Sequence, residues 1–132
     1  MVVAIVAILA ALATPRLIDA IERARVARAI ADIRAIQSQV DGSVPLPLTL
    51  AQVGFGNRLD PWGRPYVYNP FLLLDQPGSS RRDRFLVPLN SEYDLYSVGR
   101  DGLSRTPLTV PVSRDDVLRA NDGGFIGLAS RY

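Results

Sequence analysis

The residues best suited to chemistry lie in the last third of the chain. Four aspartates and one asparagine occupy three short segments of a glycine-bearing region: Asp101, Asp115, Asp116, Asn121 and Asp122. Calcium takes six to eight oxygen ligands at about 2.3–2.6 Å, from carboxylates and from backbone carbonyls that irregular loops expose. These segments can supply both kinds of oxygen, although their spacing is not that of an EF-hand. Solvated loop aspartates are the alternative that the residues leave open.

The same acids suggest no enzyme. Asp115 and Asp116 can be considered as a general acid and base, but neighbouring side chains on an extended loop diverge, and no nucleophile stands near them. The chain has no histidine and no cysteine, which excludes Ser-His-Asp and Cys-His catalysis, thiolate metal sites and disulfides. It also lacks a phosphate-binding loop. We therefore expect no catalytic activity.

Charged residues are balanced along the chain. All fifteen basic residues are arginines, and thirteen acidic residues leave a formal net charge of +2. Between Arg16 and Arg34, five arginines are interleaved with Asp19, Glu22 and Asp32. This mixed-sign pattern predicts a face that is solvated or bridges subunits, and it argues against a nucleic-acid partner.

The first thirteen residues carry no polar side chain. A helix that is apolar on every face must be buried in a bilayer, in a large core or among copies of itself. The rest of the chain is too short to wrap it. Thirteen residues at about 1.5 Å each reach only about two-thirds of the bilayer core. A secretory signal needs a basic residue before the apolar run, whereas the first one here is Arg16, so we expect natural residues upstream of Met1.

An amphipathic helix is predicted to follow. Apolar side chains between residues 17 and 40 recur at spacings near three and four: Ile18, Ile21, Val26, Ile30, Ile33, Ile36 and Val40. Pro15 is expected to kink or locally melt the junction with the apolar part, and Gly42 is expected to end the helix. We therefore divide the chain into an N-terminal helix (1–40, with its apolar part at 1–14) and a globular head (41–132).

The head is predicted to contain a small antiparallel sheet packed on the helix, which makes the fold α+β. The expected elements are a short helical turn at 49–53, strands at 65–68, 85–88 and 93–98, an exposed polar loop at 76–83, and a loop-dominated remainder at 100–132. Asp60, Pro61 and Gly63 predict a tight turn, since Asp caps, Pro fixes φ and Gly accepts a positive φ. Trp62 then has a defined place to pack.

Three segments of the sequence resemble the major pseudopilin of type II secretion systems, in the wider class of type IV pilin-like proteins. They are residues 8–15 (ILAALATP), 60–66 (DPWGRPY) and 93–102 (YDLYSVGRDG). The first resembles the end of the membrane helix shared by all pilin-like proteins, whereas the other two are more specific to the major pseudopilin. Family members begin with a phenylalanine and a nearby glutamate after leader cleavage, and both would lie upstream of Met1.

The resemblance implies a pilin-like fold and a structural role. The helix would hold the chain in the bacterial inner membrane as a single-pass protein with its head in the periplasm. It would then pack in the core of a helical homo-oligomer, the pseudopilus. Partners would include minor pseudopilins and the inner-membrane assembly platform, whose cytoplasmic ATPase drives export through an outer-membrane secretin. Proteins would thereby cross the outer membrane.

Calcium binding by the C-terminal loop is also implied by the resemblance. The matching positions are the side chain of Asp101 and the backbone carbonyls of Val98 and Leu103, with Asp115 and Asp116 as further ligands. Asn121 and Asp122 fit part of the same pattern and stand in reserve.

Two other functions remain open at this stage. A subunit of a surface filament would share the helix but extend outside the cell. A membrane-tethered calcium-binding module would not polymerise.

Overall fold

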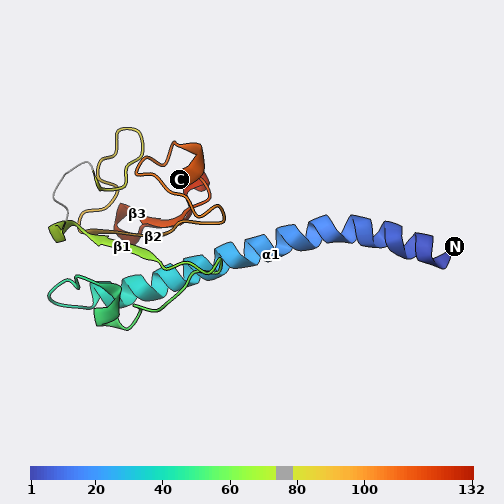
Figure 1. The fold of residues 1–132 in the computed structure, drawn as a ribbon. Coiled ribbons are helices and arrows are strands. Elements are labelled where there is room, and N and C mark those ends of the chain that lie inside the picture. The colour runs from blue at the N-terminus through green and yellow to red at the C-terminus, as the bar shows by residue number, and fades with distance from the viewer. Residues whose placement is uncertain (74–78) are drawn as a thin grey trace.

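The computed structural model of the chain describes residues 1–73 and 79–132, and it consists of one long helix with a head on its C-terminal half (Figure 1). Helix α1 spans Val2–Asp41 and ends at Gly42, as predicted. The head contains a four-stranded antiparallel sheet packed on α1. The predicted α+β architecture is therefore confirmed.

The strands follow one another in space in the order of the sequence. They are β1 (Val67–Pro70), β2 (Tyr93–Ser97), β3 (Val117–Ala120) and β4 (Phe125–Leu128). Their pairing places Val67, Tyr96, Leu118 and Gly127 in one row across the sheet. Short 3₁₀ turns lie at Leu50–Val53, Phe71–Leu73, Pro111–Ser113, Asn121–Gly123 and Ala129–Arg131. The first of them confirms the helical turn expected at 49–53.

The sheet separates two apolar clusters. On one face, the α1 side chains Ile33, Ile36 and Val40 are fully buried, in a cluster with Tyr93 and Val117. On the other face, residues of β3 pack with side chains from the loops that cover the sheet: Leu89, Leu108, Leu118, Ala120 and Ala129. The head is thus a layered unit of helix, sheet and covering loops (Figure 1).

Two of the three predicted strands are found. The strand expected at 93–98 is β2, and the one at 65–68 overlaps β1, which begins two residues later. The strand expected at 85–88 is wrong, because Asp83 and Leu86 exchange two backbone hydrogen bonds in a tight turn that leaves Phe85 fully exposed.

The remainder at 100–132 holds β3 and β4, two strands that the sequence analysis does not predict, and outside these strands it consists of loops and short turns, as expected. Both strands are only four residues long, and Arg119 and Gly127 interrupt the apolar alternation by which strands are recognised.

Two local expectations also need correction. Helix α1 continues through Pro15 without melting, and its ribbon curves gently (Figure 1). The loop expected to be exposed at 76–83 includes Ser80 and Arg81, which are both buried. Residues 76–78 of that loop lie outside the described part of the chain.

Candidate functional site

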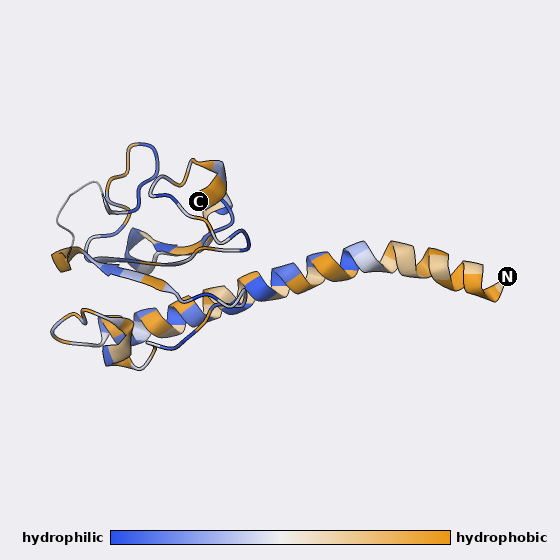
Figure 2. Cartoon of the chain, viewed as in Figure 1, coloured by the Kyte–Doolittle hydropathy of each residue, from blue (hydrophilic) through white to orange (hydrophobic). Residues whose placement is uncertain are grey.

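The N-terminal half of α1 has no protein around it. Every large apolar side chain from Met1 to Ile21 is at least 45% exposed. Figure 2 shows the resulting apolar rod projecting beyond the head. The seventeen residues from Val2 to Ile18 span about 26 Å, close to the roughly 30 Å of a bilayer core. The thirteen apolar residues alone stay shorter than a bilayer core. Together with the residues that follow them, they form a helix that is long enough and apolar enough to cross a membrane, and its most apolar eighteen-residue window is unburied.

The C-terminal half of α1 is held by hydrogen bonds to its acids. The indole Nε1 of Trp62 donates to Glu22 at 3.0 Å, and the Tyr93 hydroxyl donates to Asp41 at 2.6 Å. Buried Asp32 accepts from the Tyr66 hydroxyl at 2.9 Å and pairs with Arg58. Two acids of the mixed-sign face, together with Asp41 at the end of α1, therefore bond to the head.

These contacts perturb the tyrosines. Burial, with the hydrogen bond to Asp32, raises the pKa of Tyr66 well above its usual value. Burial and the bond to Asp41 do the same to the pKa of Tyr93. Both hydroxyls therefore stay protonated and act as donors throughout the physiological pH range.

The predicted turn at 60–63 is confirmed. Its buried residue Asp60 accepts the backbone N–H groups of Trp62 and Arg64 at 3.0 and 2.8 Å, and the Ser97 hydroxyl donates to its other oxygen. Gly63 has a φ of 86°, the left-handed conformation that the turn requires. The turn presents the Trp62 indole to Glu22 and so joins β2 to α1.

Two of the aspartates predicted as calcium ligands lie together. The Asp115 carboxylate accepts the backbone N–H of Asp101 at 2.9 Å, and the Asp101 carboxylate accepts that of Leu103 at 2.8 Å. Gly99 packs so closely on Asp115 that a Cβ there would lie 2.3 Å from the Asp115 carbonyl oxygen. The turn that carries Val98 and Leu103 is thus folded onto Asp115.

Asp116 points elsewhere. Its fully buried carboxylate accepts from the Arg81 guanidinium at 2.7 Å and from the Ser104 hydroxyl at 2.5 Å, while its Oδ1 has no hydrogen-bond partner among residues 1–73 and 79–132. Burial raises the pKa of Asp116 to about 6, although Ser104 and Arg81 act in the opposite direction. The side chains of Asp115 and Asp116 thus diverge, as expected for neighbours on an extended loop.

The reserve ligands lie at the other end of β3 and make different contacts. Asp122 accepts the backbone N–H of Ser91 at 2.8 Å, and Asn121 accepts the Tyr132 hydroxyl at 2.7 Å. The structure therefore does not bring them to Asp101.

A calcium ion would find part of its ligand set here. Among residues 1–73 and 79–132, no three acidic side chains are grouped so that they could hold a metal. Asp101 and Asp115 lie together, however, and the orphan Oδ1 of Asp116 is a buried acceptor that lacks a donor. The donors fit a hard, oxygen-binding cation in kind, with Asp101 and Asp115 as its carboxylates and loop carbonyls as further ligands.

Two buried arginines were not predicted from the sequence. Arg81 lies 4.2 Å from the ring centroid of Tyr96, and Arg119 lies 4.1 Å from that of Tyr93. Arg81 also donates its backbone N–H to buried Asp94, whose pKa burial raises. Arginine is almost never fully buried unless it is paired. The polar residues around Arg81 therefore predict an exposed side chain, and no local pattern indicates that it is buried.

No protein-family model, curated protein or solved structure matches this chain. Its function is therefore inferred from the residues and the fold.

Proposed function

We propose that the chain is a structural, non-catalytic subunit of a pilin-like filament, and specifically of a type II secretion pseudopilus. One observation carries the proposal: a single 40-residue helix is apolar and bare over its first half, and amphipathic and packed on a small head over its second. Such a helix needs a bilayer or other helices around its bare half. The three sequence segments that resemble the major pseudopilin support the more specific assignment.

In the proposed cycle, the bare half first lies in the bacterial inner membrane, with the head in the periplasm. On assembly it exchanges lipid for the bare halves of sister copies. Alanines between residues 4 and 13 allow close approach, because small side chains let helix backbones pack tightly. Minor pseudopilins and the assembly platform would be the partners, and protein export across the outer membrane the outcome.

Calcium is proposed as a stabiliser of the C-terminal loop. Asp101 and Asp115 would hold it with loop carbonyls such as those of Val98 and Leu103. Asp116 would contribute only if its free Oδ1 turned toward the ion. The ion would supply charge neutralisation for clustered carboxylates, and no chemistry beyond that.

A charge reversal on the helix tests polymerisation. Arg28 is exposed and forms no ion pair with any described residue, so Arg28→Glu should leave the melting temperature of the head unchanged. If Arg28 contacts a neighbouring subunit, filaments seen by electron microscopy should be lost. Arg84→Glu, on an exposed loop, is the matched control and should still polymerise. Equal filament formation by both variants would place Arg28 outside the contacts between subunits, whereas a chain that forms no filaments even when unmodified would favour a tethered module that does not polymerise.

A further inference from the structure

A groove opens where α1 leaves the head. It encloses about 570 Å³ between the helix, from Ile18 to Ile30, and Arg100, Leu128 and Arg131 of the head. An adjoining hollow of about 330 Å³ shares Glu22 and Arg100 with it and extends to Trp62. The combined groove runs from Ile18, in the bare half of α1, to Trp62 of the head. Its volume is typical of small-ligand sites.

The lining of the groove combines apolar and basic side chains. Its large apolar residues are Ile18, Val26, Ile30 and Leu128. Its arginines, Arg23, Arg100 and Arg131, are exposed, and none of them forms a salt bridge within the described residues.

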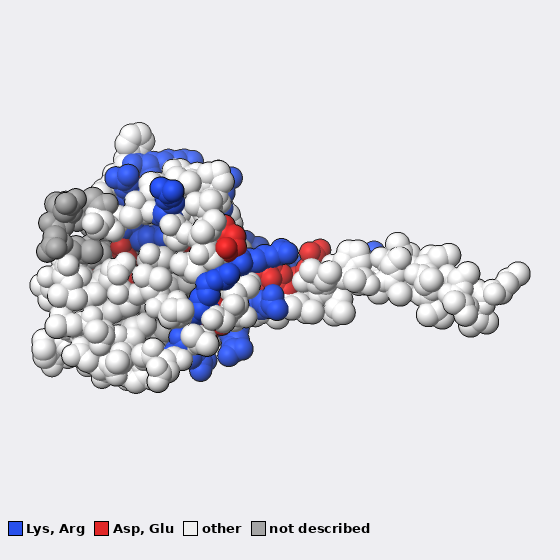
Figure 3. Space-filling view, in the orientation of Figure 1, with Lys and Arg blue, Asp and Glu red and all other residues white. Residues whose placement is uncertain are grey.

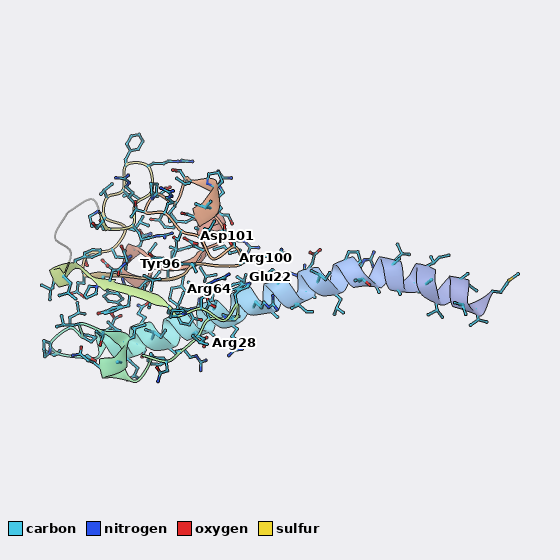
Figure 4. All side chains as sticks on the ribbon, in the orientation of Figure 1. Glu22, Arg28, Arg64, Tyr96, Arg100 and Asp101 are labelled. Carbon is cyan, nitrogen blue, oxygen red and sulfur yellow. The ribbon has the colours of Figure 1, made fainter. Side chains whose placement is uncertain are left out.

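One of the two acids in the groove is already engaged. Glu22 bonds the Trp62 indole and lies 3.5 Å from Arg25, whereas Asp19 has no described partner. Three unpaired arginines therefore face one unpaired carboxylate. Figure 4 shows Arg100 and Glu22 at this junction, and Figure 3 shows charged side chains gathered there beside an uncharged rod.

The end of the groove nearest Ile18 lies at the depth of lipid headgroups. With residues 2–18 in the hydrocarbon, a length of about 26 Å, Ile18 would lie at the boundary and the arginines just outside it. Arginines at this level interact favourably with anionic headgroups.

We propose that the groove binds an anionic phospholipid, with its phosphate on Arg23, Arg100 and Arg131 and the upper part of an acyl chain over Ile18. The proposal rests on the membrane anchoring proposed above. A second copy is the less suitable occupant, because residues 1–18 contain no acid that would complement the three arginines. An anionic lipid supplies both the apolar chain and the negative charge.

Trp62 provides a reporter, because it is the single tryptophan of the chain and lines the groove. The full chain is reconstituted in phosphatidylcholine vesicles containing a fixed minor fraction of lipid brominated on the upper acyl chain. The brominated lipid is either phosphatidylglycerol or phosphatidylcholine. We expect brominated phosphatidylglycerol to quench Trp62 fluorescence well beyond its mole fraction, and brominated phosphatidylcholine only in proportion to it.

Arg100→Gln and Arg131→Gln should each weaken this preference about fivefold, whereas Arg84→Gln should leave it unchanged. Equal quenching by the two lipids, or quenching unaffected by both groove variants, overturns the proposal. If Trp62 quenching changes with the amount of protein per vesicle and not with the charge of the lipid, the groove is occupied by a second copy of the chain, and this result also overturns the lipid proposal. Flotation of the vesicles separates the two levels of inference: if the chain fails to float with them, the membrane anchoring itself is wrong.

Discussion

The two halves of α1 both carry large apolar side chains, but these side chains lie in opposite surroundings. Ile33 and Ile36 are fully buried against the sheet, whereas Ile18 and Ile21, on the same helix, are 52% and 45% exposed. The apolar stripe predicted from Ile18 to Val40 is therefore longer than the head that covers it. Because exposed apolar surface of this size is costly in water, the uncovered part is the surface that membrane and sister copies would cover.

The largest expected effect contrasts one isoleucine from each half. Ile36→Ala removes fully buried methylene groups and leaves a cavity, which should lower the free energy of unfolding by about 2–5 kcal/mol. Ile18→Ala removes atoms from a side chain that is 52% exposed and should change the free energy of unfolding by less than about 0.5 kcal/mol. Chemical denaturation in detergent, followed by tyrosine and tryptophan fluorescence, measures both. Equal losses would mean that the bare half is packed on its own head.

Calcium should stabilise the head and have no effect on the bare half of α1. At a hundredfold excess over its dissociation constant, a bound ion stabilises the folded state by about 2.7 kcal/mol. A chelator should therefore lower the melting temperature of the head. In the presence of calcium, Asp101→Ala should also lower this melting temperature, and adding the chelator to that variant should cause no further decrease. Asp19→Ala, which removes an exposed carboxylate outside the loop, is the control. A melting temperature that does not depend on calcium would contradict the proposed site.

A pH effect should also belong to the head. In chelator, the folded-state pKa of Asp116 is raised to about 6 from its usual 3.8, so the folded state binds more protons between these values. The free energy of unfolding should consequently fall as the pH rises from about 4 to about 6, by on the order of 2 kcal/mol. Asp116→Asn should flatten this slope, although buried Asp94 shifts in the same direction and leaves a remainder. An unchanged slope in Asp116→Asn would exclude Asp116 as its source.

The smallest effect marks the border between the halves. Glu22→Ala removes the acceptor of the Trp62 indole N–H. Among the described residues, this is the hydrogen bond between head and helix that lies nearest to the bare half. Its loss should lower the free energy of unfolding by about 1 kcal/mol. Asp19→Ala, one turn earlier, should cost almost nothing, because Asp19 has no described partner. A large loss in Asp19→Ala would move the border toward the N-terminus.

The fold was predictable where one physical signal dominates. The spacing from Ile18 to Val40 predicted the helix, and the Asp60–Gly63 turn chemistry predicted the position of Trp62. Strands β3 and β4 were missed because each is short and interrupted by Arg119 or Gly127, so they exist mainly through pairing with neighbours. A strand was wrongly expected at 85–88, since apolar residues such as Phe85 there lie exposed on a turn.

The candidate site was predictable only in part. The lack of a regular pattern in this glycine-bearing region correctly suggested that Asp101 and Asp115 would lie in loops. The Asp116 side chain points away from Asp115 because it pairs with Arg81, which lies 35 positions away in the sequence. The polar composition of the segment around Arg81 had predicted that this segment is exposed. Long-range pairing of this kind leaves no local pattern in the sequence.

The central claim is that sister copies cover the bare half of α1, and disulfide cross-linking in membranes tests it most directly. The chain has no cysteine, so introduced thiols act without background. The Ile8→Cys, Leu12→Cys double variant should give a ladder of cross-linked multimers on oxidation, while Arg84→Cys on the far loop should give none. A double variant that stays monomeric, with its head still folded, would contradict the account.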